Sequence, residues 1–314
     1  MAEEKKFDLV IIGGGAAGLS AGMYAGRYLM KTAIIRGNEP GGETATAATI
    51  ENWPGTISID GFELMQNMEK HAQISGAEVF DGEVTALEKR GDCFISIVGE
   101  RLFVSKTIIL AVGSARRKLG LPNEDNLRGK GVSYCATCDA PLYKQKTIAI
   151  VGAGDAAVKG ANLAARFASK IYILTRGTEL KGEPANLEQL KAKTNVETVF
   201  GIEVKEIIGE KFIEKVVLSK PINGSPELPL QGLFVEVGAS PRTELSKMLG
   251  LELDPKGYIH VNQFMHTNIP GIYAAGDITD GAGDFRQDIT AAAQGAMAAT
   301  SAYKYIGAHR EIVC

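Results

Sequence analysis

Short, mostly apolar runs recur along the chain, and glycine-containing turns separate them from stretches with helical spacing. The first run, Phe7 to Ile12, is rich in β-branched residues and does not alternate regularly with polar positions, which is typical of a strand buried in a parallel sheet. Similar runs lie at Thr32 to Ile35 and Thr107 to Leu110, whereas Phe62 to Ala72 repeats its apolar residues as an amphipathic helix does. This pattern predicts an α/β protein.

Two apolar runs end in a glycine turn that a helix is expected to follow. Phe7 to Ile12 leads into a G-x-G-x-x-G turn, and Thr147 to Val151 leads into a G-x-G-x-x-A turn. In dinucleotide-binding folds the first glycine permits the tight turn, the second lets the backbone approach a pyrophosphate, and the last small residue lets the helix pack on the strand. The phosphates bind at the N-terminus of that helix. The chain is therefore expected to bind two nucleotides.

The repeated turn predicts two Rossmann-like, three-layer (ββα) dinucleotide-binding domains, the second inserted into the first. Gly113 to Arg116 and Gly238 to Pro241 have the composition of short crossovers between domains. The expected first domain is discontinuous, comprising residues 1–115 and 241–314, and the second covers residues 116–240. A strand that ends at Gly276 and Asp277, and an alanine-rich helix from about Ile289 to Tyr305, complete the first domain.

Composition narrows the class of protein further. A length of 314 residues with 45% hydrophobic residues is enough for two cores, and the net charge of −3 comes from mixed charges without a basic stripe for nucleic acid or membrane. We therefore expect small-molecule or protein partners. Four cysteines do not make the framework of a secreted disulfide-rich protein, so a cytoplasmic location is expected.

Cys135 and Cys138 form a C-x-x-C pair, followed directly by Asp139. This spacing lets both sulfurs meet at the start of a helical turn as a reducible disulfide. Pro141 is tolerated only in the first turn of a helix, so the pair is expected at a helix N-terminus, where a thiolate is favoured. Asp139 is the candidate acid that exchanges a proton with a sulfur.

Half of a zinc site and two buried structural cysteines are the alternatives for a C-x-x-C pair. A zinc site is disfavoured because Cys93 and Cys314 are isolated in the sequence and the four histidines lack zinc-ligand spacing. Cys93 is expected to be structural or solvent-facing, and Cys314 to be an incidental exposed thiol.

Charged residues after the second strand of each unit bear on the choice of nucleotide. Arg36 stands where an acidic residue usually holds the adenosine ribose, so either Glu39 or backbone groups are expected in that role. In the second unit, Arg176 and Lys181 follow the strand at Ile171 to Leu174 without an acidic residue at its end. This favours a 2′-phosphate, hence NADPH over NADH.

With these motifs in order, the whole chain resembles the low-molecular-weight thioredoxin reductases, which are FAD/NAD(P)-dependent members of the pyridine nucleotide-disulfide oxidoreductases. The segments that carry the resemblance, besides the paired glycine turns, are Cys135-Ala-Thr-Cys138-Asp139, Glu51-Asn-Trp-Pro-Gly55, Ala274-Ala-Gly-Asp277, and Arg286-Gln287 with Thr290. The resemblance implies a homodimer that passes electrons from NADPH through FAD and the C-x-x-C disulfide to thioredoxin or a thioredoxin-like protein.

The resemblance also implies residue roles. Cys138 would face the flavin and Cys135 would attack the disulfide of the partner. The expected FAD-binding residues are Gly13, Gly15, Ala16, Ala17, Gly18, Arg36, Gly41, Gly42, Glu43, Asn52, Val84, Ala111, Gly113, Gly276, Asp277, Arg286, Gln287 and Asp288. The expected NADPH-binding residues are Gly152, Gly154, Asp155, Ala157, Arg176 and Lys181.

The sequence departs from the family at the NADPH segment. The family pattern there is His-Arg-Arg with a further Arg, and these positions hold Thr175, Arg176, Gly177 and Lys181. A glutamate pair of the family is replaced by Lys159 and Gly160. These changes leave the electron donor open, with NADH, ferredoxin or a deazaflavin as alternatives to NADPH. They also leave two other functions open: a dithiol oxidase that passes electrons to oxygen, and a redox sensor without turnover.

Overall fold

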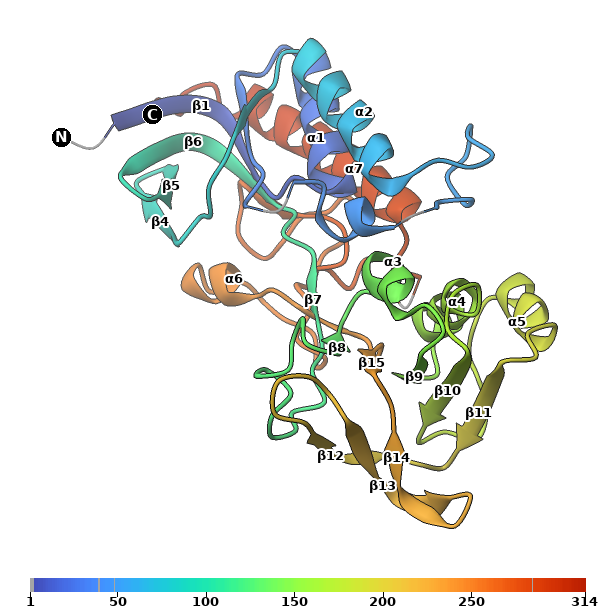
Figure 1. The fold of residues 1–314 in the computed structure, drawn as a ribbon. Helices are drawn as coiled ribbons and strands as arrows, with labels where there is room; N and C mark the ends of the chain where they lie inside the picture. Colours follow the sequence, from blue (N-terminus) through green and yellow to red (C-terminus); the bar gives the residue numbers. More distant parts are fainter. Residues whose placement is uncertain (1–2, 39, 48, 284) are drawn as a thin grey trace. The chain divides into compact units, whose positions relative to one another are not determined.

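The computed structural model describes residues 3–38, 40–47, 49–283 and 285–314 (Figure 1). The chain divides into two compact units, one formed by the residues up to Ala115 together with Pro241–Cys314, and one formed by Arg116–Ser240.

The first unit contains a seven-stranded sheet. Its order is β3 (Glu78–Phe80), β2 (Thr32–Ile35), β1 (Glu3–Ile12), β6 (Arg101–Leu110), β5 (Cys93–Val98) and β4 (Ala86–Arg90), and β17 (Ile272–Ala274) also pairs with β6. Strands β1, β2, β3, β6 and β17 are parallel, whereas β4 and β5 join through antiparallel pairing. The parallel strands carry near-continuous apolar residues because both of their faces are covered.

Three helices lie together on one side of this sheet (Figure 1): α1 (Ala16–Arg27), α2 (Gly61–Ile74) and α7 (Asp288–Ala308). Asp60 caps α2 by accepting a hydrogen bond from the amide of Glu63, and Gln287 with Thr290 forms a capping box at the start of α7. Helices α1 and α7 lie so close together that a Cβ at Gly295 would be only 1.9 Å from the carbonyl oxygen of Ala17. The small residues in these helices therefore set how near they can pack.

The second unit has a five-stranded parallel sheet between helices and a smaller sheet. The parallel order is β11 (Val196–Phe200), β10 (Lys170–Thr175), β9 (Thr147–Val151), β15 (Gly232–Val235) and β8 (Val132–Ser133), and the antiparallel sheet is β12 (Val204–Ile208), β13 (Lys215–Ile222) and β14 (Ser225–Pro229). Along β9, Ile148 and Ile150 pack with the helices, whereas Ala149 packs with the antiparallel sheet. The unit is therefore built of three layers.

The helices of this unit are α3 (Ala136–Asp139), α4 (Asp155–Ala164) and α5 (Pro184–Lys191). The remaining short elements are η1 (Gly42–Thr46), β7 (Ser114–Arg116), η2 (Ala140–Tyr143), β16 (Ala239–Pro241) and α6 (Glu244–Met248). Strands β7 and β16 pair with each other where the chain crosses between the units. The expected fold class, two dinucleotide-binding domains of α/β type, is confirmed.

Cys93 and Cys314 are joined in a disulfide, with Cα atoms 5.8 Å apart. The expectation that these cysteines are isolated and that Cys314 is an incidental thiol is therefore wrong. Cys93 opens β5, and the chain end returns to it across 221 residues of sequence, a proximity that linear spacing does not reveal. The sulfurs pack with Ile95, Val104 and Ile312 in a small apolar cluster.

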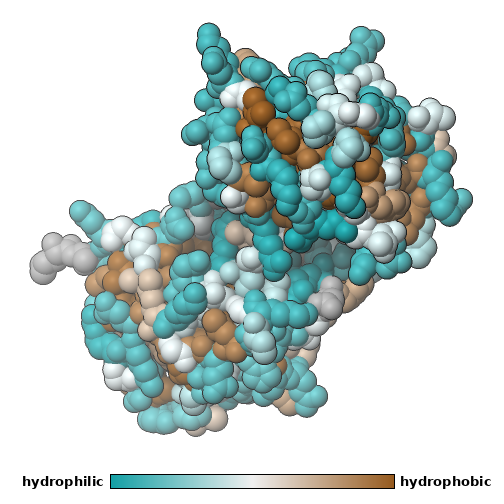
Figure 2. Space-filling model, turned by 90° about the horizontal axis from the view of Figure 1, so that it is seen from below, coloured by the Kyte–Doolittle hydropathy of each residue, from teal (hydrophilic) through white to brown (hydrophobic). Residues whose placement is uncertain are grey.

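Hydrophilic residues cover much of the surface in view in Figure 2, and the apolar residues form separate patches between them. Exposed large apolar side chains occur in both units, for example Leu29 and Ile57 in the first and Leu142 and Phe212 in the second. In the part of the chain that the structure describes, no helix has both the length and the apolar character needed to cross a membrane.

Candidate functional site

The first unit holds a cavity of about 710 Å³ at one edge of its sheet. Its walls include the residues that follow β1, β2, β6 and β17. These strands are parallel, so their carboxyl ends meet at one edge, which is where open α/β sheets bind ligands. The cavity has the size of a cofactor site.

The first glycine turn forms one wall of this cavity. Gly13 has a φ of +121°, and a Cβ there would lie 2.1 Å from the carbonyl oxygen of Ala111. Gly18 packs its backbone on the same turn, since its Cβ would lie 1.9 Å from the oxygen of Gly13. Gly15 is the N-cap residue of α1 and has no side chain, so the first amides of the helix are left for an anionic ligand.

Arg36 lines the cavity at the end of β2 and is held by two carboxylates. Its Nε lies 2.6 Å from Oδ1 of Asp81, and its Nη1 lies 2.7 Å from Oε1 of Glu69. Hydrogen bonding to Asp81 raises the pKa of Arg36 and in turn lowers the pKa of Asp81. Arg36 is therefore held in place at the cavity wall, and two carboxylates offset its positive charge. Glu39, the alternative ribose ligand, lies outside the described residues.

Two acids line the cavity beyond β17. Burial raises the pKa of Asp277, and the positive charge of Arg286 opposes this rise only in part. A carboxyl in this position is suited to pair with a ligand hydroxyl. Asp288, in the first turn of α7, accepts a 2.5 Å hydrogen bond from the hydroxyl of Thr44 and so connects η1 to α7.

The structure brings most of the residues expected at FAD together around this cavity. Lining it are Gly13, Gly15, Ala16, Ala17, Arg36, Gly41, Gly42, Glu43, Val84, Ala111, Gly113, Gly276, Asp277 and Asp288. Four expected residues are not in its lining: Gly18, Asn52, Arg286 and Gln287. Asn52 donates a 3.0 Å hydrogen bond to Gln287, and the guanidinium of Arg286 lies 3.9 Å from the ring centroid of Tyr258.

Other lining residues were not expected, among them Thr44, Glu83, Thr85, Arg242, Glu244, Leu245 and Met248. Glu244, Leu245 and Met248 belong to α6, which is too short to show an amphipathic pattern. A bare glycine turn, an open helix N-terminus and a buried acid together fit a dinucleotide that carries hydroxyl groups, as FAD does.

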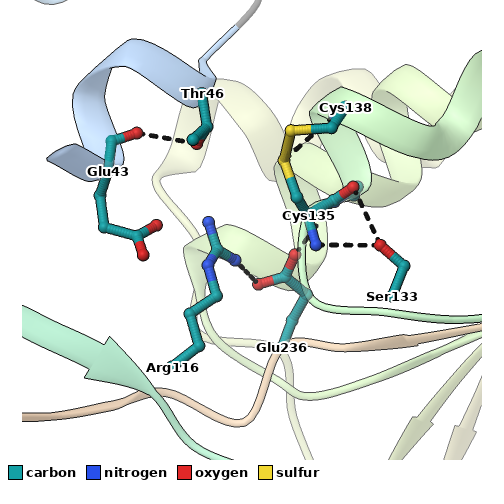
Figure 3. The surroundings of a disulfide bond; sticks show 8 residues. Glu43, Thr46, Arg116, Ser133, Cys135, Cys138 and Glu236 are labelled. Carbon is teal, nitrogen blue, oxygen red and sulfur yellow. Dashed lines mark hydrogen bonds and ion pairs between the residues drawn. A yellow bond between two sulfur atoms is a disulfide. The ribbon is translucent and has the colours of Figure 1, made fainter. Parts of the chain in front are cut away.

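Cys135 and Cys138 are joined in a disulfide at the start of α3 in the second unit, with Cα atoms 5.3 Å apart (Figure 3). Cys135 is the N-cap residue of α3, and its sulfur accepts a 3.1 Å hydrogen bond from the amide of Cys138. The hydroxyl of Ser133 accepts from the Cys135 amide at 3.1 Å and donates to the Cys135 carbonyl at 3.3 Å. The expected helix N-terminus is present, and Pro141 lies in the first turn of η2.

Asp139, the candidate acid, is the last residue of α3 and its amide donates to the carbonyl oxygen of Cys135 at 3.2 Å. Burial raises the pKa of Tyr143, and the charge of Asp139 adds to this rise. Among the described residues, no cluster of three or more histidine, cysteine or acidic side chains is arranged to hold a metal. Both cysteines of the motif are joined in the disulfide.

The second glycine turn packs against the end of β15, the strand next to β9 in the sheet. Gly152 has a φ of +153°, and a Cβ there would lie 2.2 Å from the carbonyl oxygen of Glu236. Gly154 is the N-cap residue of α4, and Ala157 is fully buried beneath the turn. Arg176 and Lys181 are both exposed beyond β10, and the amide of Lys181 donates to Ala153 at 2.6 Å.

Asp155, expected at the nucleotide, instead connects α4 to the start of α5. Its Oδ1 accepts from the amide of Glu183 at 2.8 Å and from Asn186 at 3.0 Å, and its Oδ2 lies 2.7 Å from Nζ of Lys159. Burial alone would raise the pKa of Asp155, but these hydrogen bonds lower it. The carboxylate is therefore ionised and engaged within the unit.

The pyridine nucleotide-disulphide oxidoreductase family matches residues 7–301. The chain is 36% identical over 306 residues to a thioredoxin reductase of Listeria innocua, covering 97% of this chain and 95% of that protein. It is similar to the crystal structure of Lactococcus lactis thioredoxin reductase, with a TM-score of 0.91, 37% identity and coverage of 96% and 99%. For the crystal structure of T. acidophilum thioredoxin reductase the TM-score is 0.88, with 34% identity and coverage of 95% and 98%.

Proposed function

Because this chain belongs to the pyridine nucleotide-disulphide oxidoreductase family, we propose that it is a flavoprotein thioredoxin-disulfide reductase. It passes electrons from NADPH through FAD and the Cys135–Cys138 disulfide to thioredoxin or a thioredoxin-like protein. The observation that carries this proposal is the disulfide at the N-cap of α3, next to an amide that donates to one of its sulfurs. It works as a homodimer, as its resemblance to the low-molecular-weight reductases implies. Its location is the cytoplasm, because its four cysteines do not make the framework of a secreted disulfide-rich protein.

In the first unit, Gly13, Gly15 and the start of α1 would hold the pyrophosphate of FAD, and Asp277 would accept from a ribityl hydroxyl. FAD supplies a group that exchanges an electron pair. The protein residues supply binding and a fixed position. Because Arg36 is already paired with Asp81 and Glu69, it contributes shape rather than free charge at the adenosine end.

In the second unit, the reduced cysteines carry out thiol–disulfide exchange with the protein substrate. The thiolate of Cys135 attacks one substrate sulfur, forms a mixed disulfide and releases the other as a thiolate, which takes up a proton. Cys138 then attacks Cys135, which restores the enzyme disulfide and releases the substrate dithiol. Asp139 lies in the same helical turn and is the proton donor or acceptor for these sulfurs.

Replacing Cys138 by serine tests this assignment, because the second exchange step cannot close without its sulfur. We expect Cys138→Ser to lose NADPH-dependent reduction of thioredoxin by at least about a thousandfold, the scale of removing a covalent catalyst, and to accumulate the mixed disulfide. Cys314→Ser, assayed well below its melting temperature, is the matched control, since it breaks a disulfide outside the motif and should retain the parental rate. Reduction of thioredoxin by Cys138→Ser at the parental rate would exclude the proposed function.

The donor is proposed to be NADPH because two exposed cations, Arg176 and Lys181, follow β10 where a 2′-phosphate would lie. Replacing both by alanine should raise KM for NADPH by about tenfold or more, the effect of losing charged hydrogen bonds, and leave KM for NADH nearly unchanged. Steady-state kinetics with both nucleotides measures this. Equal changes for both nucleotides would argue against a 2′-phosphate site.

One observation favours a different donor. Asp155 places an ionised carboxylate in the first turn of α4, at the helix end where a pyrophosphate would bind, although Lys159 balances part of its charge. Anaerobic mixing with NADPH, NADH and reduced ferredoxin in turn, followed by flavin absorbance, identifies the donor. Peroxide release from a small dithiol without bleaching of the flavin by any nucleotide would support a dithiol oxidase.

A further inference from the structure

A buried acid, Glu236, lies beside the redox cysteines in the second unit (Figure 3). It is 7% exposed and forms an ion pair in which Nη1 of Arg116 lies 2.6 Å from its Oε2. Its Oε1 accepts from the amide of Ala136, the first residue of α3, at 3.5 Å. The same carboxylate therefore contacts a cation and the backbone between the two cysteines.

The topology of the sheet explains why Glu236 and Cys135 are neighbours. Strands β15 and β8 are parallel partners, and Phe234 is paired with Ser133. Two residues further along each strand, Glu236 and Cys135 leave the sheet at the same edge. Because Glu236 and Cys135 belong to the same unit, Glu236 stays beside the cysteines in any orientation of that unit.

We propose that Glu236 is a positioning residue for the redox cysteines, which fixes the start of α3 and disfavours the thiolate of Cys135 through its negative charge. Two groups act on this sulfur in opposite directions. The amide of Cys138 donates to it and stabilises a thiolate, whereas the nearby carboxylate destabilises one. Arg116 offsets part of the carboxylate charge. The balance of these groups sets how readily the disulfide is reduced.

Glu236→Gln tests the charge, because the amide keeps the size and an oxygen acceptor for Ala136. We expect the pH profile of Cys135 alkylation by iodoacetamide, followed by peptide mass spectrometry, to shift downward by about one unit, as for a lost neighbouring charge. At pH 8.5, exchange of the disulfide with two glutathione thiols, which yields the enzyme dithiol and glutathione disulfide, should move toward the dithiol by up to about tenfold, or 30 mV.

Arg116→Gln tests the opposite sign, since it leaves the carboxylate with less compensation. We expect the alkylation profile to move upward and the exchange constant to fall. Glu236→Asp retains the charge and should stay close to the parent. Glu227→Gln is the matched control, because it removes an exposed carboxylate on β14 in the same unit.

The outcomes separate this role from a structural one. A residue that only supports the fold would lower the melting temperature in Glu236→Gln while the alkylation profile and the exchange constant stay within about twofold of the parent, inside the scatter expected of a neutral change. That result overturns the proposal. Shifts in the same direction for Glu236→Gln and Arg116→Gln would also overturn it, because a charge effect requires opposite signs.

Discussion

At the scale of single residues, the cavity of the first unit depends on glycines, which have no Cβ, and on the carboxyl group of one buried acid. Gly13 and Gly18 leave no room for a Cβ, so the turn between β1 and α1 can form only with these residues. Asp277 is different, because burial disfavours its ionised carboxylate and so raises its pKa. Its presence is better explained by a ligand than by folding.

Asp277→Asn tests this interpretation in flavin-free protein. A carboxyl whose pKa is higher in the folded state than its ordinary 3.8 stabilises the fold below that pH, and this contribution is lost as pH rises through the folded pKa. The variant should therefore melt at a higher temperature than the parent at pH 7, with the difference shrinking toward pH 4. It should also bind FAD about tenfold more weakly, the effect of one lost charged hydrogen bond. An equal difference in melting temperature at both pH values would contradict the pKa argument.

At the scale of elements, the packing of α1 against α7 depends on small side chains. Gly295 faces Ala17 so closely that an added methyl group would overlap the backbone of α1. In the same helix, Gly307 has open space around its Cα. These two positions allow the effect of packing to be separated from the effect of helix propensity.

Gly295→Ala should lower the free energy of unfolding by about 1–3 kcal/mol, the usual result of overpacking a core. Gly307→Ala, the matched control, should be neutral or raise it by up to about 1 kcal/mol, because alanine is the better helix former. Denaturant unfolding measures both. If the two variants respond alike, close approach of α1 and α7 does not limit stability.

The sequence predicted elements where the local signal agreed with the final packing. β1, β2 and β9 are continuous apolar runs, and the glycine turns after β1 and β9 lie where they were expected. The antiparallel strands β12 to β14 were not predicted, because charged residues interrupt their apolar face and only packing on the parallel sheet stabilises them.

Site residues were likewise predicted where the sequence carried a local signal. Residues in recognisable turns, such as Gly15 and Asp277, line the cavity, whereas the contribution of α6 came from a segment without a local pattern. Glu236 was missed because its role arises from the pairing of β15 with β8, strands about a hundred residues apart in sequence. The Cys93–Cys314 disulfide was missed for the same reason.

At the scale of the whole molecule, the Cys93–Cys314 disulfide closes more than two thirds of the chain into one loop. Cross-linking residues separated by 221 positions restricts the unfolded chain by about 5 kcal/mol in the chain-entropy model. The end of the chain otherwise rests on few contacts, chiefly the buried side chain of Ile312.

Cys314→Ser should therefore lower the melting temperature by several degrees, as expected for a loss of a few kcal/mol, and should speed tryptic cleavage after Arg310, an exposed residue whose backbone would be less firmly held. Val313→Ser changes a residue that is 86% exposed beside it and should leave both properties unchanged. Calorimetry and limited proteolysis of the oxidised proteins measure these effects. Identical melting of Cys314→Ser and the parent would mean that the disulfide does not stabilise the fold.

The amide of Arg242 donates a 3.2 Å hydrogen bond to the carbonyl of Gly113. This bond holds the two ends of the first unit side by side, so a tight loop of a few residues could join them. A second module can therefore be inserted at this position without breaking any strand of the host sheet.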